Sequence, residues 1–168
     1  IAFAYRQEAS GGRGGADGVA GFVAASAAAG ASGLILPDLP PDMVREGYRE
    51  ACDQAGLHPV YVVSPNTGRE RLEVIAEAGS GLLYATSRTG TTGKEMDLEM
   101  RELTGFLASA REICGMPIAV GFSISTREQV EALGGHADIA VVGTHFIRVW
   151  EEGGTAALEA ELNKLTGS

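Results

Sequence analysis

The sequence predicts an α/β fold in which helices wrap a parallel β-sheet. Short runs of β-branched and apolar residues alternate with helix-length segments whose apolar residues recur with a period of 3.6, as in parallel β/α units. The strand segments are almost entirely apolar, and such continuous hydrophobicity is typical of strands buried on both faces. We place six strands in this way, over residues 1–6, 33–39, 59–64, 81–87, 117–123 and 139–144.

The segments between these strands have apolar faces at helical spacing, which would cover the sheet. These faces comprise Val19, Phe22, Val23, Ala27 and Gly30, then Met43, Val44, Tyr48, Ala51, Cys52 and Ala55, and later Leu103, Phe106, Leu107, Ala110, Ile113 and Cys114. The last helix should end at Gly115 and Pro117, which disfavour its continuation.

Two capping boxes mark the starts of further helices. Thr67 with Glu70, and Ser125 with Glu128, have the spacing at which a hydroxyl and a carboxylate satisfy the first free N–H groups. Their positions agree with a repeated order of strand, loop and helix.

Length and composition fit a single soluble domain over residues 1–168. The chain has 13 basic and 22 acidic residues, a formal net charge of −9 and no basic stripe, which argues against nucleic-acid binding. No apolar stretch approaches the roughly 20 residues that a membrane helix needs. Cys52 and Cys114 fall on apolar helix faces, so we expect buried free thiols and a cytoplasmic location. The chain starts at Ile1 without a signal sequence, and we take it as a fragment of a longer reading frame.

Three consecutive strands run into turns rich in glycine and hydroxyl groups. The turns lie at 86–93, 121–125 and 143–144. In a parallel sheet the carboxyl ends of these strands share one edge, and small residues let backbone N–H groups approach an anion. The sequence therefore predicts one bound phosphate, held mainly by backbone N–H groups because no Lys is positioned to contact it.

Four motifs follow one another in a definite order between about Phe22 and the C-terminus. They are the run 36–41, then Tyr84, Ser87, Arg88, Gly90, Thr92 and Gly93, then Gly121, Phe122, Ile124 and Ser125, and finally Val142, Gly143 and Thr144. In order and spacing these motifs resemble a known family, the tryptophan synthase alpha subunits. The resemblance implies a (β/α)8 TIM barrel. This chain would hold about six of its β/α units, strands 3 to 8, with the phosphate-binding half over residues 81–150.

The resemblance also implies an activity in tryptophan biosynthesis. The family is a lyase that cleaves indole-3-glycerol phosphate to indole and glyceraldehyde 3-phosphate, and it passes indole to a beta subunit. Pyridoxal phosphate belongs to that partner, so no cofactor and no metal is expected in this chain.

Carried over residue by residue, the resemblance assigns substrate contacts to Tyr84, Thr92, Phe122 and Ile124, and phosphate contacts to Gly93, Ser123, Gly143 and Thr144. Two positions depart from the family pattern, because Ser123 replaces a common Gly and Thr144 replaces a common Ser. The Ser123 side chain could crowd the phosphate or contact it through its hydroxyl. We expect the site to bind phosphate with the Ser123 side chain present.

The family's two catalytic carboxylates, a Glu and an Asp, belong to the first two strand–loop units and are not expected in this chain. Without these proton-transfer groups, binding alone would give almost no turnover. Asp38 is the one carboxylate predicted at the end of a strand. The resemblance implies a role at the beta-subunit interface, and the alternative is an acid that caps a turn before Pro40.

Two other functions stay open: another sugar-phosphate barrel enzyme, and a non-catalytic phosphate-binding module that complements or activates a partner. Six units leave open sheet edges, so self-association is also expected. Among the remaining polar residues, His58, His136 and His145 lack metal-ligand spacing, and we interpret them as structural. Trp150 should pack the last helix onto the barrel.

Overall fold

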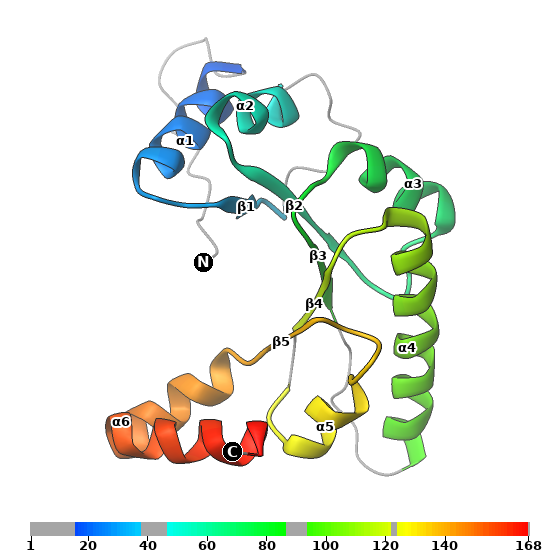
Figure 1. Cartoon of the computed structure of the whole chain (residues 1–168), viewed down its shortest axis with the longest axis vertical. Helices are drawn as coiled ribbons and strands as arrows, with labels where there is room; N and C mark the ends of the chain where they lie inside the picture. Colours follow the sequence, from blue (N-terminus) through cyan, green and yellow to red (C-terminus); the bar gives the residue numbers. More distant parts are fainter. Residues whose placement is uncertain (1–15, 38–46, 87–93, 122–123, 168) are drawn as a thin grey trace.

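Five parallel strands form one sheet in the computed structural model, which describes residues 16–37, 47–86, 94–121 and 124–167. The strands are β1 (Gly33–Ile35), β2 (His58–Val63), β3 (Leu83–Thr86), β4 (Ile118–Gly121) and β5 (Ile139–Val141). The helices are α1 (Ala16–Ala28), α2 (Tyr48–Ala55), α3 (Arg69–Ala78), α4 (Lys94–Cys114), α5 (Arg127–Ala132) and α6 (Thr144–Thr166). They lie in an arc along one side of the sheet, as in the wall of an incomplete barrel (Figure 1).

The strand order in the sheet is the order in the chain, β1-β2-β3-β4-β5, and every neighbouring pair is parallel. This topology confirms the predicted β/α repeat. Each of the predicted segments from residue 33 onward overlaps a strand, with β2 starting one residue before its predicted segment, whereas the segment 1–6 lies outside the described residues. The segment 139–144 was extended too far, because Thr144 begins α6 rather than ending β5.

The core lies between the sheet and the inner faces of the helices. Its largest fully buried side chains are Val23, Cys52, Pro59, Val63, Ile75, Leu83, Leu103, Leu107, Ile118 and Val120. Strand β4 is buried at all its positions, as its apolar run predicts. Strand β5 is not, since Ile139 is 45% exposed. The apolar run at β5 predicted burial on both faces and was wrong, because β5 pairs only with β4 within the described residues.

The helix boundaries correct several predictions. Helix α2 starts at Tyr48 after Gly47, whose φ of 62° favours glycine, while Met43 and Val44 lie outside the described residues. The predicted box at Thr67 is wrong: Gly68 is the N-cap of α3, and the Thr67 hydroxyl accepts a hydrogen bond from the N–H of Ser64.

The second box exists one residue later than predicted. Thr126 is the N-cap of α5, and its partner is Gln129 rather than Glu128. Helix α4 ends as expected before Gly115, which has a φ of 62°.

The two cysteines are free thiols, as expected. Cys52 is fully buried, and burial raises the pKa of its thiol. Cys114 is half-buried, and its thiol donates to the carbonyl of Leu72. The prediction that Trp150 packs the last helix onto the barrel is wrong, because Trp150 is 56% exposed. Within the described part of the chain, no helix has the length and apolar character needed to cross a membrane.

Asp138 ties the beginning of β5 to β4 and α4. Its carboxylate accepts hydrogen bonds from the N–H of Ile118 and from Nη2 of Arg111, each at 2.8 Å. The N–H of Asp138 donates to the carbonyl of Ile118 at 2.9 Å, so Asp138 holds β4 through both its backbone and its side chain. The hydrogen bond from the Ile118 N–H first, and then the one from Arg111, lower the pKa of the Asp138 carboxyl.

We expect Asp138→Asn to lower the free energy of unfolding near neutral pH. A carboxyl with a lowered pKa stabilises the fold above its unfolded pKa of about 3.9, and this contribution is lost as pH falls through the folded value. Urea unfolding between about pH 7 and pH 3 should therefore show a shallower acid loss in the variant. Glu73→Gln, which removes a carboxylate from an exposed pair with Arg69, is the control. Identical pH profiles for Asp138→Asn and the parent chain would refute this role.

Candidate binding pocket at the carboxyl ends of the strands

A pocket of about 580 Å³ lies where β3, β4 and β5 end and α6 begins. Parallel pairing brings these strand ends to one edge of the sheet. The pocket is lined by Tyr84, Ile124, Ser125, Val141, Gly143, Thr144, His145 and Arg148. The lining is mixed, with apolar surface from the strands and polar groups from the loops and α6. Such a mixture suits a ligand with an apolar body and an anionic end.

The pocket brings together four residues named from the sequence, Tyr84, Ile124, Gly143 and Thr144. The other predicted positions lie outside the described residues: Asp38, Arg88, Thr92, Gly93, Phe122 and Ser123. Sequence reasoning missed Arg148 and interpreted His145 as structural. The available signal was helical spacing, because Arg148 follows Thr144 by four residues and so shares its helix face.

Gly121 makes room for the side chain of Tyr84, which lines the pocket. Tyr84 is half-buried on β3, in register with Ala119 of β4, and Gly121 is buried at the end of β4. A Cβ added at Gly121 would lie 2.6 Å from Cζ of Tyr84 and closer still to its Oη. Real Cβ atoms do not approach other atoms so closely. The absence of a side chain at Gly121 therefore sets the position of the Tyr84 ring.

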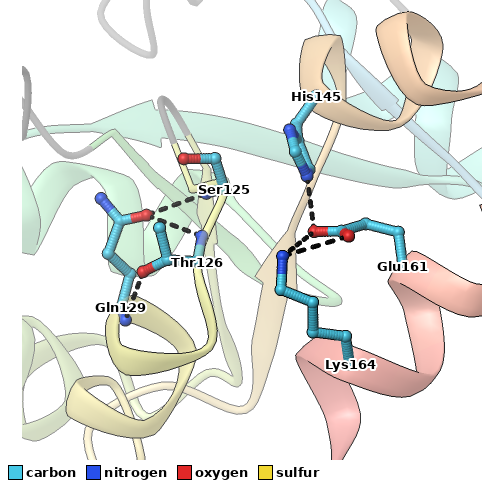
Figure 2. Close-up of polar contacts among 6 residues, drawn as sticks. All are labelled: Ser125, Thr126, Gln129, His145, Glu161 and Lys164. Atoms are coloured by element: carbon cyan, nitrogen blue, oxygen red, sulfur yellow. Dashed lines mark hydrogen bonds and ion pairs between the residues drawn. The ribbon is translucent and has the colours of Figure 1, made fainter. Parts of the chain in front are cut away.

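The turn after β4 is held by Gln129. Its Oε1 accepts hydrogen bonds from the N–H of Ser125 at 2.8 Å and of Thr126 at 3.1 Å, as Figure 2 shows. The Thr126 hydroxyl accepts from the N–H of Gln129 in return. Because Gln129 already occupies the N–H of Ser125, the pocket-facing group that Ser125 can offer a ligand is its hydroxyl.

Gly143 is the N-cap of α6, with a φ of −104° and a ψ of −88°. No heavy atom lies within 4 Å of a Cβ built on it, so a side chain at this position would enter open space at the pocket. The N–H groups in the first turn of a helix have no intrahelical acceptor and are favourable to anions. An anion at this end of the pocket would meet the first turn of α6.

Helix α6 bends sharply at Gly154, whose φ is 64° and ψ is −158°, so its second half folds back toward the pocket. This return brings Glu161 to His145, with 2.9 Å between Oε1 and Nε2. Lys164 contacts the same carboxylate at 3.1 Å and 3.2 Å (Figure 2). The hydrogen bonds from His145 and then Lys164 lower the pKa of the Glu161 carboxyl. The second half of α6 thus holds the His145 side chain in place at the pocket wall.

The pocket side chains are suited to binding rather than to metal chemistry. Among the residues that the structure describes, no group of three or more His, Cys, Asp or Glu side chains could hold a metal ion. The lining residues offer hydroxyls, an imidazole and a guanidinium, which are donors to an anion. They include no Asp or Glu among the described positions.

The chain matches a known protein family in sequence. The family model described as "Tryptophan synthase alpha chain" matches residues 15–166. The tryptophan synthase alpha chain of Syntrophotalea carbinolica is 40% identical over 148 residues, which cover 88% of this chain and 58% of the relative. That of Methanosarcina barkeri is 40% identical over 139 residues, covering 81% and 51%. The chain thus spans about half the length of the curated relatives it matches.

Solved structures of tryptophan synthase from one organism have a fold similar to that of this chain. The structure of the tryptophan synthase complex from Pyrococcus furiosus has a TM-score of 0.76 and 31% identity, covering 90% of this chain and 61% of that chain. A second structure from this organism, of an α2β2 complex described in terms of mutual activation, has a TM-score of 0.75 and 33% identity, covering 89% and 61%.

We expect Gly121→Ala to displace the Tyr84 ring and to lower the free energy of unfolding by roughly 1–3 kcal/mol, the range for overpacked sites. Urea unfolding measures the loss. Gly105→Ala is the matched control, because Gly105 is exposed on α4 with no atom near its Cβ direction, and alanine favours a helix.

Adding Tyr84→Ala to the Gly121→Ala chain tests the assigned cause. The double variant should lose less than the sum of the two single losses, because the clash needs both side chains. Strict additivity would contradict the contact.

Proposed function

The chain belongs to the tryptophan synthase alpha chain family, and from this premise we propose that it binds indole-3-glycerol phosphate. In the proposed reaction, a lyase step of tryptophan biosynthesis, the C–C bond between the indole ring and the glycerol phosphate breaks. Indole and glyceraldehyde 3-phosphate are released. One observation carries the proposal: the fold gathers Tyr84, Ile124, Gly143 and Thr144 around one pocket of suitable size.

The proposed orientation of the substrate follows from the chemistry of the lining. The phosphate would lie at Gly143 and Thr144, where the first turn of α6 offers N–H groups, together with Gly93 and Ser123. The indole ring would contact the apolar side formed by Tyr84 and Ile124, with Phe122 and Thr92 as further contacts.

Cleavage also needs a group that protonates the indole ring carbon and a base that takes the hydroxyl proton. No Asp or Glu is among the described residues of the pocket lining. We therefore propose that the catalytic Glu and Asp come from the portion of the relatives' length that this chain does not span. The reaction requires no cofactor of its own in this proposal.

We propose a beta subunit as the partner, with pyridoxal phosphate on that subunit and Asp38 at the interface. The similar structures from Pyrococcus furiosus include an α2β2 complex, which supports such a partner. A cytoplasmic location is consistent with two free thiols, since disulfides are rare in reducing compartments.

A second function is favoured by the exposed side of β5 and α6. Three large apolar residues are exposed on β5 and the first half of α6, Ile139 at 45%, Ile147 at 59% and Trp150 at 56%. An edge strand beside exposed apolar side chains is a site for added β structure. In this alternative the chain is a phosphate-binding module that complements a separate barrel segment, activates a partner or associates with itself.

We expect Gly143→Val to abolish phosphate binding. The branched side chain would enter the open space at the N-terminus of α6, where the phosphate is proposed to lie. Titration calorimetry with sn-glycerol 3-phosphate measures the loss. His136→Ala, at an exposed turn residue, should leave the affinity unchanged. Equal losses in the two variants would show that the assigned site is misplaced.

We expect the chain alone to release indole from indole-3-glycerol phosphate at a rate close to background. Mixing it with the unmatched remainder of the Syntrophotalea carbinolica alpha chain should raise the rate by orders of magnitude, because each proton-transfer group contributes about 10²–10⁴. An indole assay follows the rate.

The control for this mixing experiment is the same fragment with its catalytic Glu and Asp replaced by alanine, which should restore nothing. Strong activity of the 168-residue chain without any fragment would show that a group of its own transfers the protons.

A further inference from the structure

A phosphate monoester poses an electrostatic problem for this chain. The ligand has a charge of about −1.5 to −2 at neutral pH, whereas the chain has a formal net charge of −9. The end of a helix supplies only about half a positive charge. Backbone N–H groups alone therefore leave much of the ligand charge uncompensated. Cationic side chains in the pocket would add to the compensation of this charge.

The pocket holds two side chains that can do this, His145 and Arg148. They follow Gly143 in the first turns of α6, and the spacing of Thr144 and Arg148 places both on one helix face. The Arg148 guanidinium makes no ion pair or hydrogen bond with any other residue that the structure describes. Its donors are thus available to a ligand, although Arg side chains elsewhere in the chain are paired with carboxylates.

His145 is held in a fixed orientation by the returning half of α6. Its side chain is 28% exposed, and its Nε2 lies 2.9 Å from Oε1 of Glu161, which is 15% exposed. Figure 2 shows the other ring nitrogen on the side of the ring away from Glu161, and His145 and Ser125 both line the pocket. Because Glu161 occupies Nε2, the ring nitrogen left for a ligand is Nδ1, from which a protonated imidazole ring donates.

The charged and titratable groups around His145 agree with this arrangement. Within the described residues they are Glu161 and Lys164 on the second half of α6, Arg148 on the first half, and Tyr84 across the pocket. Lys164 shares the Glu161 carboxylate but does not line the pocket. Among the residues that the structure describes, Glu161 is the acid that contacts His145, and it is absent from the pocket lining.

We propose that His145 and Arg148 form a cationic wall that binds the phosphate group of the substrate, with Glu161 as the residue that positions His145. This inference rests on the proposed function and adds side-chain contacts to the backbone contacts expected from the sequence. The guanidinium can give two parallel hydrogen bonds to phosphate oxygens, and the His145 ring, when protonated, adds a third from Nδ1. The wall selects a phosphate monoester over a neutral triol of the same shape.

Arg148→Met tests the first contact, because methionine keeps an unbranched stem without the charge. Titration calorimetry with sn-glycerol 3-phosphate should show affinity on the order of tenfold weaker, the size of one charge-assisted contact. Arg69→Met removes the same charge from an exposed pair on α3, far along the sheet, and should stay within about twofold. Equal affinities for the parent chain and Arg148→Met would overturn the role of Arg148.

His145 is tested by NMR, since the chain has three histidines and their ring signals can be assigned by substitution. Adding sn-glycerol 3-phosphate should shift the His145 ring signals and leave those of His58 and His136 in place. Glu161→Gln should shrink the shift and weaken binding, and Glu161→Asp should recover part of both. Unmoved His145 signals at saturating ligand would overturn its role.

The two proposals fail in different ways. If Gly143→Val abolishes binding while Arg148→Met and His145→Asn bind as tightly as the parent chain, the pocket stands and the cationic wall is wrong. If the parent chain binds no sn-glycerol 3-phosphate, the proposed function fails, and the wall fails with it.

Discussion

Parallel pairing of β3, β4 and β5 is the constraint on which the pocket depends. It brings the carboxyl ends of the three strands to one edge, so residues as distant in sequence as Tyr84 and Arg148 line the same cavity. The pairing is secured at its start by Asp138, which binds the backbone of Ile118 twice. Once that register is set, Gly121 lies against the ring of Tyr84, which lines the pocket.

Some polar groups around the pocket form hydrogen bonds within the fold, and others remain for a ligand. Gln129 takes the N–H groups of Ser125 and Thr126, which fixes the loop after β4. Glu161 takes Nε2 of His145 and Nζ of Lys164. The first turn of α6 and the Arg148 guanidinium are left for a ligand, and they offer positive charge in a chain that is acidic overall.

The strands of the sheet differ in how completely they are buried. Strand β4 is buried throughout, with β3 and β5 beside it and α4 packed nearby, whereas β5 leaves Ile139 exposed. Ile147 and Trp150 are also exposed, on the first half of α6. The wall of the pocket and the uncovered surface thus share one element. A segment that covers β5 and α6 would therefore act on the same helix that is proposed to bind phosphate.

The sequence by itself determined the parallel α/β fold and much of the pocket. Apolar runs predict strands because a strand covered on both faces excludes polar residues. Glycine-rich turns predict Gly143 because glycine has no side chain to fill the space beside its backbone. Only the tertiary structure decided the capping partner of Thr126, the exposure of Trp150 and the pairing of His145 with Glu161. That last contact spans 16 residues and exists because α6 reverses at Gly154. Local patterns report which residues favour a helix or a strand, but contacts across a bend depend on how the chain packs in three dimensions.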